Sequence, residues 1–445
     1  MARRKFLFLQ GVATPFFKEL SKAISSRGHE TYRVNFCGGD ALFSIGTKSW
    51  RFNQPIEQLP NWLEEKHHKY HFTDIVLFGD TRPVHKSAIA LLQEKGVSIH
   101  VYEEGYLRPN WVTLESNGVN GHSELLKKPA EFWHKITDSE ETDKINEVGK
   151  TFGIRATHDI NYRLANALLK PLFPYYRTHR PANALLEYAG WATRLPTIKL
   201  WRARKDNRTI RQLIAQKQSF YLFPLQLDSD SQIKVHSPYN SIEHAIERVL
   251  SSFAQNAPSD ALLVVKNHPL ATGLIDHYKQ VMRRADSLGI RHRIRFLEAG
   301  HLPTLLKNTA GTILVNSTTG TSALYHGSPT CALGKAIFDI PGLTFQGGLD
   351  RFWTEGAPAD KNLYRSFRHT IIKHTQINGD FYSRRGIKLA IEGSLARLNI
   401  EPVSVSITAT ETVTVTNTEP LTTDLLPITS YGGKLPSNSY MYRKH

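Results

Sequence analysis

Several features that are common in proteins are scarce in this chain of 445 residues. Only two cysteines occur, Cys37 and Cys331, and no CxxC or Cys/His spacing surrounds them. This excludes a disulfide framework and gives no support for a zinc site. No stretch approaches the roughly 18 consecutive apolar residues of a membrane-spanning helix. The apolar run near Met1 is also far too short for a secretory signal. We therefore expect a protein that stays in the cytosol with reduced thiols.

Familiar catalytic and nucleotide-binding signatures are absent as well. No GxGxxG sequence follows the first expected strand, which argues against a dinucleotide-dependent oxidoreductase, and no Gly-Lys-Ser/Thr sequence marks a P-loop. Neither a GxSxG elbow nor an HExxH helix is present. Acidic residues are outnumbered, with Asp+Glu 40 against Lys+Arg 56, so the formal net charge is +16. That charge suits nucleic acid, an anionic membrane or a phosphate-bearing substrate, and composition alone does not choose among them.

The order of the expected elements indicates an α/β protein with two doubly wound domains. Short apolar runs alternate with amphipathic stretches from residue 5 to 102 and again from 220 to 325, a pattern typical of parallel sheets. We predict a GT-B-like fold, in which two Rossmann-like domains face a cleft and ligands bind beyond the carboxyl ends of the strands. The predicted parts are an N-terminal domain, a helical linker, a second α/β domain and a low-complexity, disordered tail, over residues 1–120, 121–212, 213–400 and 401–445.

Two groups of carboxylates follow expected strands. Glu103 and Glu104 come directly after the strand expected over 97–102, where a carboxylate can take a proton from a hydroxyl. A solvated loop pair is the plainer explanation. Asp228 and Asp230 follow the strand expected over 220–224, where an Asx-rich turn is the plainer explanation.

Two further motifs at strand ends offer groups that bind phosphate. Lys266 ends the strand expected over 261–266, directly after the apolar run 261–265, and His268-Pro269 follows it. The proline holds His268 extended so that its imidazole can donate to a phosphate. A turn of hydroxyl residues precedes the helix expected from Gly320; its backbone N–H groups suit an anion, and a simple N-cap turn is the alternative. The turn holds Ser317, Thr318 and Thr319.

A stretch rich in aromatic and basic residues lies between residues 173 and 211. It is either a helical linker with snorkelling arginines or a patch that meets anionic lipid headgroups, and we predict the patch. Its principal members are Trp191, Trp201, Arg202, Arg204 and Lys205. No zinc finger or RNP-type motif accompanies the basic residues, so we expect no nucleic-acid binding.

Several of these motifs together resemble a known family. The chain is similar to the capsular polysaccharide biosynthesis and export proteins of the KpsS type over about residues 5–353. The resemblance rests on Phe8-Leu9-Gln10-Gly11, Arg33-Val34-Asn35-Phe36-Cys37-Gly38-Gly39-Asp40, Phe78-Gly79-Asp80-Thr81-Arg82-Pro83, Tyr102-Glu103-Glu104-Gly105-Tyr106-Leu107-Arg108-Pro109, Pro224-Leu225-Gln226, His268-Pro269, Asn316-Ser317-Thr318 and Gly348-Leu349-Asp350-Arg351-Phe352-Trp353. It implies an enzyme that transfers β-linked Kdo (3-deoxy-D-manno-octulosonic acid) from CMP-Kdo to a (lyso)phosphatidylglycerol-type acceptor, which starts the lipid linker of a capsular polysaccharide.

The resemblance also implies roles for individual residues. CMP-Kdo is β-configured, so a β-linked product means retention, for which related enzymes use a carboxylate nucleophile in a Gln-x-x-x-Asp pattern. Here Gln226 and Asp230 match that pattern, with Asp228 as an alternative. Glu104, or second Glu103, would be the acid/base at the acceptor. His268 with its neighbours Lys266 and Pro269, and the hydroxyls of Ser317, Thr318 and Thr319, would hold the CMP phosphate.

The remaining expectations concern partners and place. We expect no cofactor and no metal ion, although Asp228-Ser229-Asp230 has the form of a metal motif. The resemblance implies a peripheral position on the anionic cytoplasmic face of the inner membrane, with a KpsC-type enzyme and the capsule export machinery as further partners. Two alternatives stay open: a GT-B transferase that uses another nucleotide sugar in surface polysaccharide assembly, and a non-catalytic component of capsule export.

Overall fold

The N-terminal part of the chain builds a seven-stranded sheet with the strand order β12-β6-β5-β4-β1-β2-β3. The computed structural model describes residues 2–133, 145–149, 151–178, 189–190, 192, 194, 196–197, 201–227 and 231–403. Strands β1 to β5 pair in parallel, whereas β6 is antiparallel to both β5 and β12. Its strands are β1 (Lys5–Phe8), β2 (Glu30–Asn35), β3 (Ser49–Arg51), β4 (Asp74–Phe78), β5 (Ser98–Glu104), β6 (Trp111–Ser116) and β12 (Gln376–Asn378).

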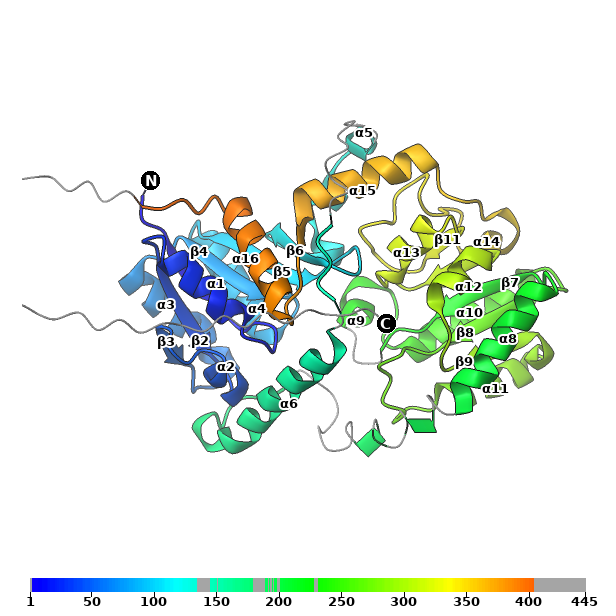
Figure 1. The fold of residues 1–445 in the computed structure, drawn as a ribbon, viewed down its shortest axis with the longest axis horizontal. Helices are drawn as coiled ribbons and strands as arrows, with labels where there is room; N and C mark the ends of the chain where they lie inside the picture. Colours follow the sequence, from blue (N-terminus) through cyan, green and yellow to red (C-terminus); the bar gives the residue numbers. More distant parts are fainter. Residues whose placement is uncertain are drawn as a thin grey trace, which may run out of the picture. The chain divides into compact units, whose positions relative to one another are not determined.

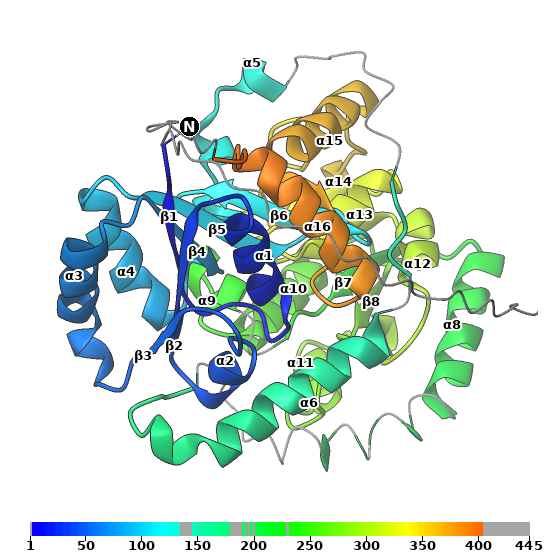
Figure 2. The same cartoon turned by 60° about the vertical axis from the view of Figure 1, so that its left-hand side comes forward.

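Alternate residues of the central strands point to opposite faces of this sheet, and helices cover both faces. Phe6 and Phe8 of β1 pack in one cluster with side chains of two helices, α1 (Phe16–Ser25) and α16 (Arg384–Arg397). Leu7 and Leu9 face the other side, in a cluster with side chains of α3 (Leu59–Tyr70) and α4 (Pro83–Glu94). Figures 1 and 2 show α16, coloured orange, alongside α1.

A second, five-stranded sheet is parallel throughout and has the order β11-β10-β7-β8-β9. Its strands are β7 (Phe220–Pro224), β8 (Leu262–Lys266), β9 (Ile294–Leu297), β10 (Gly311–Leu314) and β11 (Thr330–Ala332). Phe223 and Val265 face a cluster that includes residues of α10, α11 and α14, and Leu222 and Val264 face one with residues of α8, α12 and α13. The predicted fold class, α/β with two doubly wound sheets, is therefore confirmed.

The remaining helices lie between the strands or join the two sheets. They are α2 (Gly38–Leu42), α5 (Ala130–Trp133), α6 (Phe152–Leu168), α8 (Ala203–Ala215), α9 (Ser231–His236), α10 (Ile242–Asn256), α11 (His277–Ser287), α12 (Leu302–Asn308), α13 (Thr319–Tyr325), α14 (Leu349–Glu355) and α15 (Lys361–Thr375). Short 3-10 turns complete the elements: η1 (Ile56–Gln58), η2 (Asn120–His122), η3 (Glu124–Lys127), η5 (Lys170–Leu172) and η7 (Arg291–Arg293). Among the described residues, none of these helices has the length and hydropathy to cross a bilayer.

The chain returns to the first sheet near its C-terminal end. Residues 376–397, which the sequence pattern places in the second domain, supply the edge strand β12 and the covering helix α16. An antiparallel edge strand can come from any distant segment, so sequence order does not reveal this pairing. The predicted tail, from residue 404 onward, lies outside the described residues, and the predicted domain boundaries stay predictions.

The carboxyl edges of the two sheets are in contact through loops. Thr321 in α13 donates a hydrogen bond from its Oγ1 to the carbonyl oxygen of Tyr106, which follows β5, at 2.8 Å. Tyr106 and Leu107 also share a buried apolar cluster with Leu314 of β10. The polar residues that follow the parallel strands of both sheets therefore gather around one region, where ligands of such sheets bind.

Candidate functional site

Two adjacent carboxylates end strand β5, and their surroundings differ. The Glu103 carboxylate accepts a hydrogen bond from the Glu104 N–H at 2.9 Å, and burial raises the pKa of Glu103 to about 7 despite the opposing charges of Arg82 and Arg108. Glu104 points the other way, where its carboxylate accepts a hydrogen bond from the Tyr382 hydroxyl and pairs with Arg155 at 3.4 Å. Glu103 is thus poised to gain or lose a proton near neutral pH, whereas Glu104 is held in an ion pair.

A glycine next to this pair allows the chain to turn. A Cβ at Gly105 would lie 2.3 Å from the carbonyl oxygen of Trp111, closer than any side chain can approach backbone. Only glycine fits such a close approach of two backbone segments. The turn carries the chain from β5 to Tyr106, which contacts the second sheet.

His268 lies at the end of β8 in a cationic environment. Burial, together with the positive charges of Lys266, Arg108 and Arg155, lowers the pKa of His268 to about 4. Lys266 is itself buried, which lowers its pKa. The positive charge of Arg108 lowers the pKa of both Glu103 and His268, so the ends of β5 and β8 both lie within reach of this charge. The clustered cations Lys266, Arg108 and Arg155 favour the binding of an anion there.

A hydrogen-bonded network behind His268 fixes its backbone. The His268 N–H donates to Asn267 Oδ1 at 2.8 Å, and Asn267 Nδ2 donates to Glu298 Oε2 at 3.0 Å. Glu298 also accepts from Arg194 and, at 2.7 Å, from Arg202. Arg202, which is predicted to belong to the membrane patch, therefore forms an ion pair with Glu298, the residue that follows β9. Pro269 is exposed beside this network.

Gln226 lies buried after β7 and is bonded to the loop after β10. Its Nε2 donates to Asn316 Oδ1 at 3.0 Å, and the Asn316 N–H donates to Gln226 Oε1 at 3.1 Å. This reciprocal pair holds the loop that carries the predicted hydroxyl turn. Within the turn, the Ser317 hydroxyl donates to Thr319 Oγ1 at 3.1 Å, and the Thr318 carbonyl accepts from Thr321 at 2.8 Å. Gln226 therefore positions these hydroxyls through Asn316.

Some predicted site residues fall outside what can be described. Asp228 and Asp230, the candidate nucleophiles, lie outside the described residues, as does Trp191 of the membrane patch. In the same patch Trp201 is 78% exposed, and Arg204 and Lys205 are also exposed.

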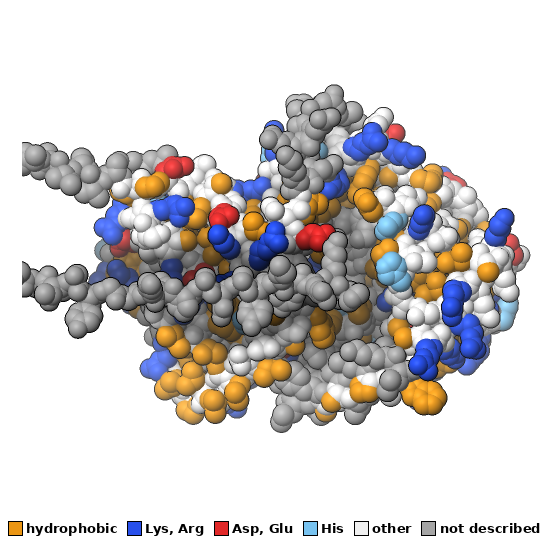
Figure 3. Space-filling model, viewed as in Figure 1, with side chains coloured by type: hydrophobic (Ala, Val, Ile, Leu, Met, Phe, Trp, Pro, Cys, Tyr) orange, Lys and Arg blue, Asp and Glu red, His pale blue; other side chains and the backbone are white. Residues whose placement is uncertain are grey.

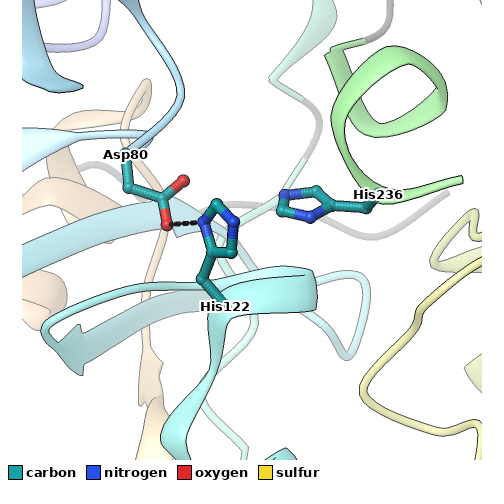
Figure 4. A group of neighbouring side chains, drawn as sticks. All are labelled: Asp80, His122 and His236. Atoms are coloured by element: carbon teal, nitrogen blue, oxygen red, sulfur yellow. Dashed lines mark hydrogen bonds and ion pairs between the residues drawn. The ribbon is translucent and has the colours of Figure 1, made fainter.

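A second cluster is not predicted from the sequence. Asp80 follows β4, His122 ends η2 and His236 ends α9, and potential ligand atoms of the three lie within 4.8 Å of one another. Figure 4 shows His122 between the other two, with its Nδ1 at 2.9 Å from Asp80 Oδ2. Burial lowers the pKa of His236 to about 4, so its ring is neutral at pH 7. The strand-end position of Asp80 is the only signal in the sequence, because the histidines are distant along the chain.

An exposed apolar face along α6 is also missing from the predictions. Figure 3 shows hydrophobic side chains gathered over this helix. Ile160, Leu164 and Leu168 are 50%, 54% and 70% exposed, and their four-residue spacing places them on one side of the helix. The opposite side packs on α2, where Asn166 Oδ1 accepts from the Gly39 N–H at 2.7 Å. The four-residue repeat is visible in the sequence and could have served as a signal.

Comparisons with known proteins identify the relatives of this chain. The model of a family described as capsule polysaccharide biosynthesis protein matches residues 73–382. Capsule polysaccharide export protein KpsS of Escherichia coli is 33% identical over 382 residues, which is 86% of this chain and 98% of that protein. Capsule polysaccharide modification protein LipB of Neisseria meningitidis serogroup B is 33% identical over 384 residues, which is 85% of this chain and 91% of that protein. Among solved structures, the KpsC β-Kdo 2,7 transferase of Thermosulfurimonas dismutans is matched over 89% of this chain and 100% of that chain, at 13% identity and a TM-score of 0.39.

Proposed function

Because this chain belongs to the capsule polysaccharide biosynthesis protein family, we propose that it is a glycosyltransferase. In this proposal it moves β-Kdo from CMP-Kdo to a (lyso)phosphatidylglycerol acceptor with retention of configuration. One observation carries the proposal: the positive charge of Arg108 lowers the pKa of both Glu103 and His268. Glu103 has a pKa of about 7, and His268 lies among cations. A proton-transfer group next to an anion-binding group is what transfer from a nucleotide sugar requires.

The charges around His268 suit the proposed donor. CMP-Kdo carries a phosphodiester and the sugar's own carboxylate, so it brings negative charge to Lys266, Arg108 and Arg155. The same cations and burial hold the pKa of the free His268 near 4. A bound anion opposes both effects, because it stabilises the protonated imidazole. Donor binding and proton uptake by His268 are therefore coupled in this proposal.

Retention requires two displacements at the same carbon. In the first step a carboxylate attacks the anomeric carbon and CMP leaves with the electron pair of the broken bond. In the second step the acceptor hydroxyl loses its proton to a base and attacks the glycosyl–enzyme ester, which frees the carboxylate. Asp230 stays the predicted nucleophile. For the base we propose Glu103 over Glu104, because Glu104 is held by Arg155 and Tyr382.

The acceptor is a lipid, so we propose that the protein docks on an anionic bilayer. The exposed face of α6 supports this, because Leu164 and Leu168 can enter the interface while Lys170 and Arg177 remain exposed for lipid headgroups. Arg155 at the start of the same helix pairs with Glu104. Helix α6 thus connects the proposed membrane surface to the proposed site, and a KpsC-type enzyme and export machinery complete the proposed partners.

A direct assay tests the transfer. Purified protein incubated with CMP-Kdo and short-chain or lyso-phosphatidylglycerol should give a mono-Kdo lipid by mass spectrometry. Glu103→Gln should lower the turnover rate by roughly 10²–10⁴-fold, whereas the adjacent Glu104→Gln, which keeps an acceptor for Tyr382, should lower it much less. Absence of product with every acceptor refutes the transfer, and equal rates for the two variants refute the assignment of the base.

Nucleotide binding separates the alternatives. A ligand that binds only the native state raises its thermal stability, so CMP should protect the protein and His268→Ala should remove that protection. Protection by UDP or UMP in place of CMP would favour another nucleotide sugar. No protection by any nucleotide, together with liposome binding, would favour a non-catalytic export component.

The membrane surface has its own test. Leu164→Glu with Leu168→Glu should reduce sedimentation with phosphatidylglycerol vesicles and leave CMP protection unchanged. The matched control reverses Arg204 and Lys205 of the predicted basic patch. Loss of sedimentation only in the control would show that the basic patch, and not α6, is the membrane-binding surface.

A further inference from the structure

We propose that Asp80, His122 and His236 form a binding site for one divalent transition metal ion of the Zn²⁺ class, which ties the two sheets together. Their potential ligand atoms lie within 4.8 Å of one another. Asp80 and His122 come from loops of the first sheet, following β4 and β6, and His236 comes from α9, between β7 and β8 of the second. A bound ion would therefore join residues of both sheets, a role beyond the proposed transfer.

The kinds of donor select the metal. Two imidazole nitrogens and one carboxylate oxygen are the set found in zinc sites that keep a fourth position for water, and they also suit iron(II), cobalt(II) and nickel(II). Calcium and magnesium prefer oxygen ligands alone. No spaced Cys/His motif marks these residues in the sequence, because the ligands come together from three separate segments.

Two of the three ligands are already held in place. Asp80 is 6% exposed, and its Oδ2 accepts from the Val119 N–H at 3.2 Å. The His236 carbonyl accepts from the Lys335 N–H at 2.7 Å, which fixes the end of α9. Bound nitrogen and oxygen ligands at about 2.0–2.1 Å from zinc lie roughly 3.4 Å apart. The required closing movement falls to His122, whose side chain is 50% exposed.

A second observation points to a ligand at His236. His236 is 3% exposed, and its Nε2 is buried with no hydrogen-bond partner. A buried polar atom without a partner costs free energy, which a coordinate bond to a metal would recover. Gly121 packs directly on the ring, because a Cβ there would lie 2.4 Å from His236 Nδ1. The ring therefore has little room to turn towards another partner.

Asp80 also fits the surroundings of a metal-binding histidine. Histidine ligands commonly donate their second ring N–H to a carboxylate, which fixes the tautomer and raises the basicity of the ligating nitrogen. The Asp80–His122 hydrogen bond of 2.9 Å has this form. Asp80 can thus ligate the ion directly or orient His122 Nε2 towards it, and either arrangement requires all three residues.

The test uses the full chain without a histidine tag and Zn²⁺ alone, so it does not depend on any transfer activity. Competition with a chromophoric chelator should give one tight site per chain. His122→Ala and His236→Gln should each weaken that site by more than about 100-fold, and Asp80→Asn by at least about 10-fold. The matched control is His292→Ala, an exposed histidine outside the cluster, which should bind as the unaltered protein does.

Cobalt gives a second readout that needs no loss of function. His122 is half exposed, so His122→Cys should fold, and Co²⁺ should then produce a thiolate-to-cobalt charge-transfer band that His292→Cys does not show. Equal Zn²⁺ affinity in the cluster variants and the control would overturn the proposal. Weak binding of several ions to the surface histidines, unchanged in every variant, would overturn it as well.

Discussion

The buried carboxyl of Glu115 in β6 gives a prediction that does not depend on the proposed activity. Glu115 is 8% exposed, and its Oε1 accepts a hydrogen bond from the Tyr106 hydroxyl at 2.5 Å. The Ser123 hydroxyl donates to its Oε2. Burial raises the pKa of Glu115 to about 7, although both hydrogen bonds favour the ionised form. Replacement by glutamine keeps the shape of the side chain and removes the ionisation.

The magnitude follows from the two pKa values. The folded value of about 7 stands against 4.5 for the ordinary group, and each pKa unit corresponds to about 1.36 kcal/mol. Between these values the folded protein retains a proton that the unfolded chain releases, so stability falls as the pH rises. The contribution of Glu115 is fully present below pH 4.5 and is lost by about pH 7, a change of about 3 kcal/mol.

Urea unfolding followed by tryptophan fluorescence, from about pH 5 to about pH 8, measures this change. The unaltered protein should lose stability across that interval, and Glu115→Gln should lose about 2.5 kcal/mol less, because the first part of the change lies below about pH 5. Glu103, also with a pKa of about 7, titrates in the same interval, so Glu103→Gln serves as the comparison. If the Glu115→Gln and unaltered curves run parallel, the carboxyl is ionised in the folded protein and the reasoning fails.

Three further predictions address the local structure. Gly105→Ala should destabilise the protein by more than about 2 kcal/mol, because the new Cβ would overlap the Trp111 carbonyl; an unchanged melting temperature would contradict this close approach. Asp360→Ala should cost about 1 kcal/mol in chemical unfolding, since Asp360 caps α15 through a bond from the Leu363 N–H at 2.6 Å, and Asp360→Asn should restore most of it. The pKa of His268, about 4 in the free protein, should rise when CMP binds, as followed by NMR titration of labelled histidines; a value that does not move would separate His268 from the phosphate.

Much of the fold is accessible from the sequence because buried parallel strands are short apolar runs. The strand expected over 220–224 is β7, and the strand expected over 261–266 begins one residue before β8. Strands β3, β6 and β12 were not predicted. β3 and β12 have three residues each, and β6 is a six-residue strand antiparallel to its neighbours. Such short or antiparallel strands depend on pairing with distant segments, which periodicity does not record.

The candidate site is predictable in part for the same reason. Strand ends are visible in a sequence, so Glu103, His268 and Ser317 can be named as candidates from their positions after expected strands. What each side chain does there is set by contacts between distant segments. The bonds of Glu104 with Tyr382 and of Gln226 with Asn316 span 278 and 90 positions of the chain. The two histidines near Asp80 were missed because they too approach only when both sheets have formed.

The late return of the chain to its first sheet has a consequence for synthesis on the ribosome. Residues 376–397 emerge last of all the described elements, so until then β6 lacks its outer partner β12 and the α1 side of the sheet lacks the cover of α16. Phe6, Phe8 and Val76 would present apolar surface during that interval, which is the kind of surface that chaperones bind. Cutting the chain between its two sheets would therefore not release two independent folding units.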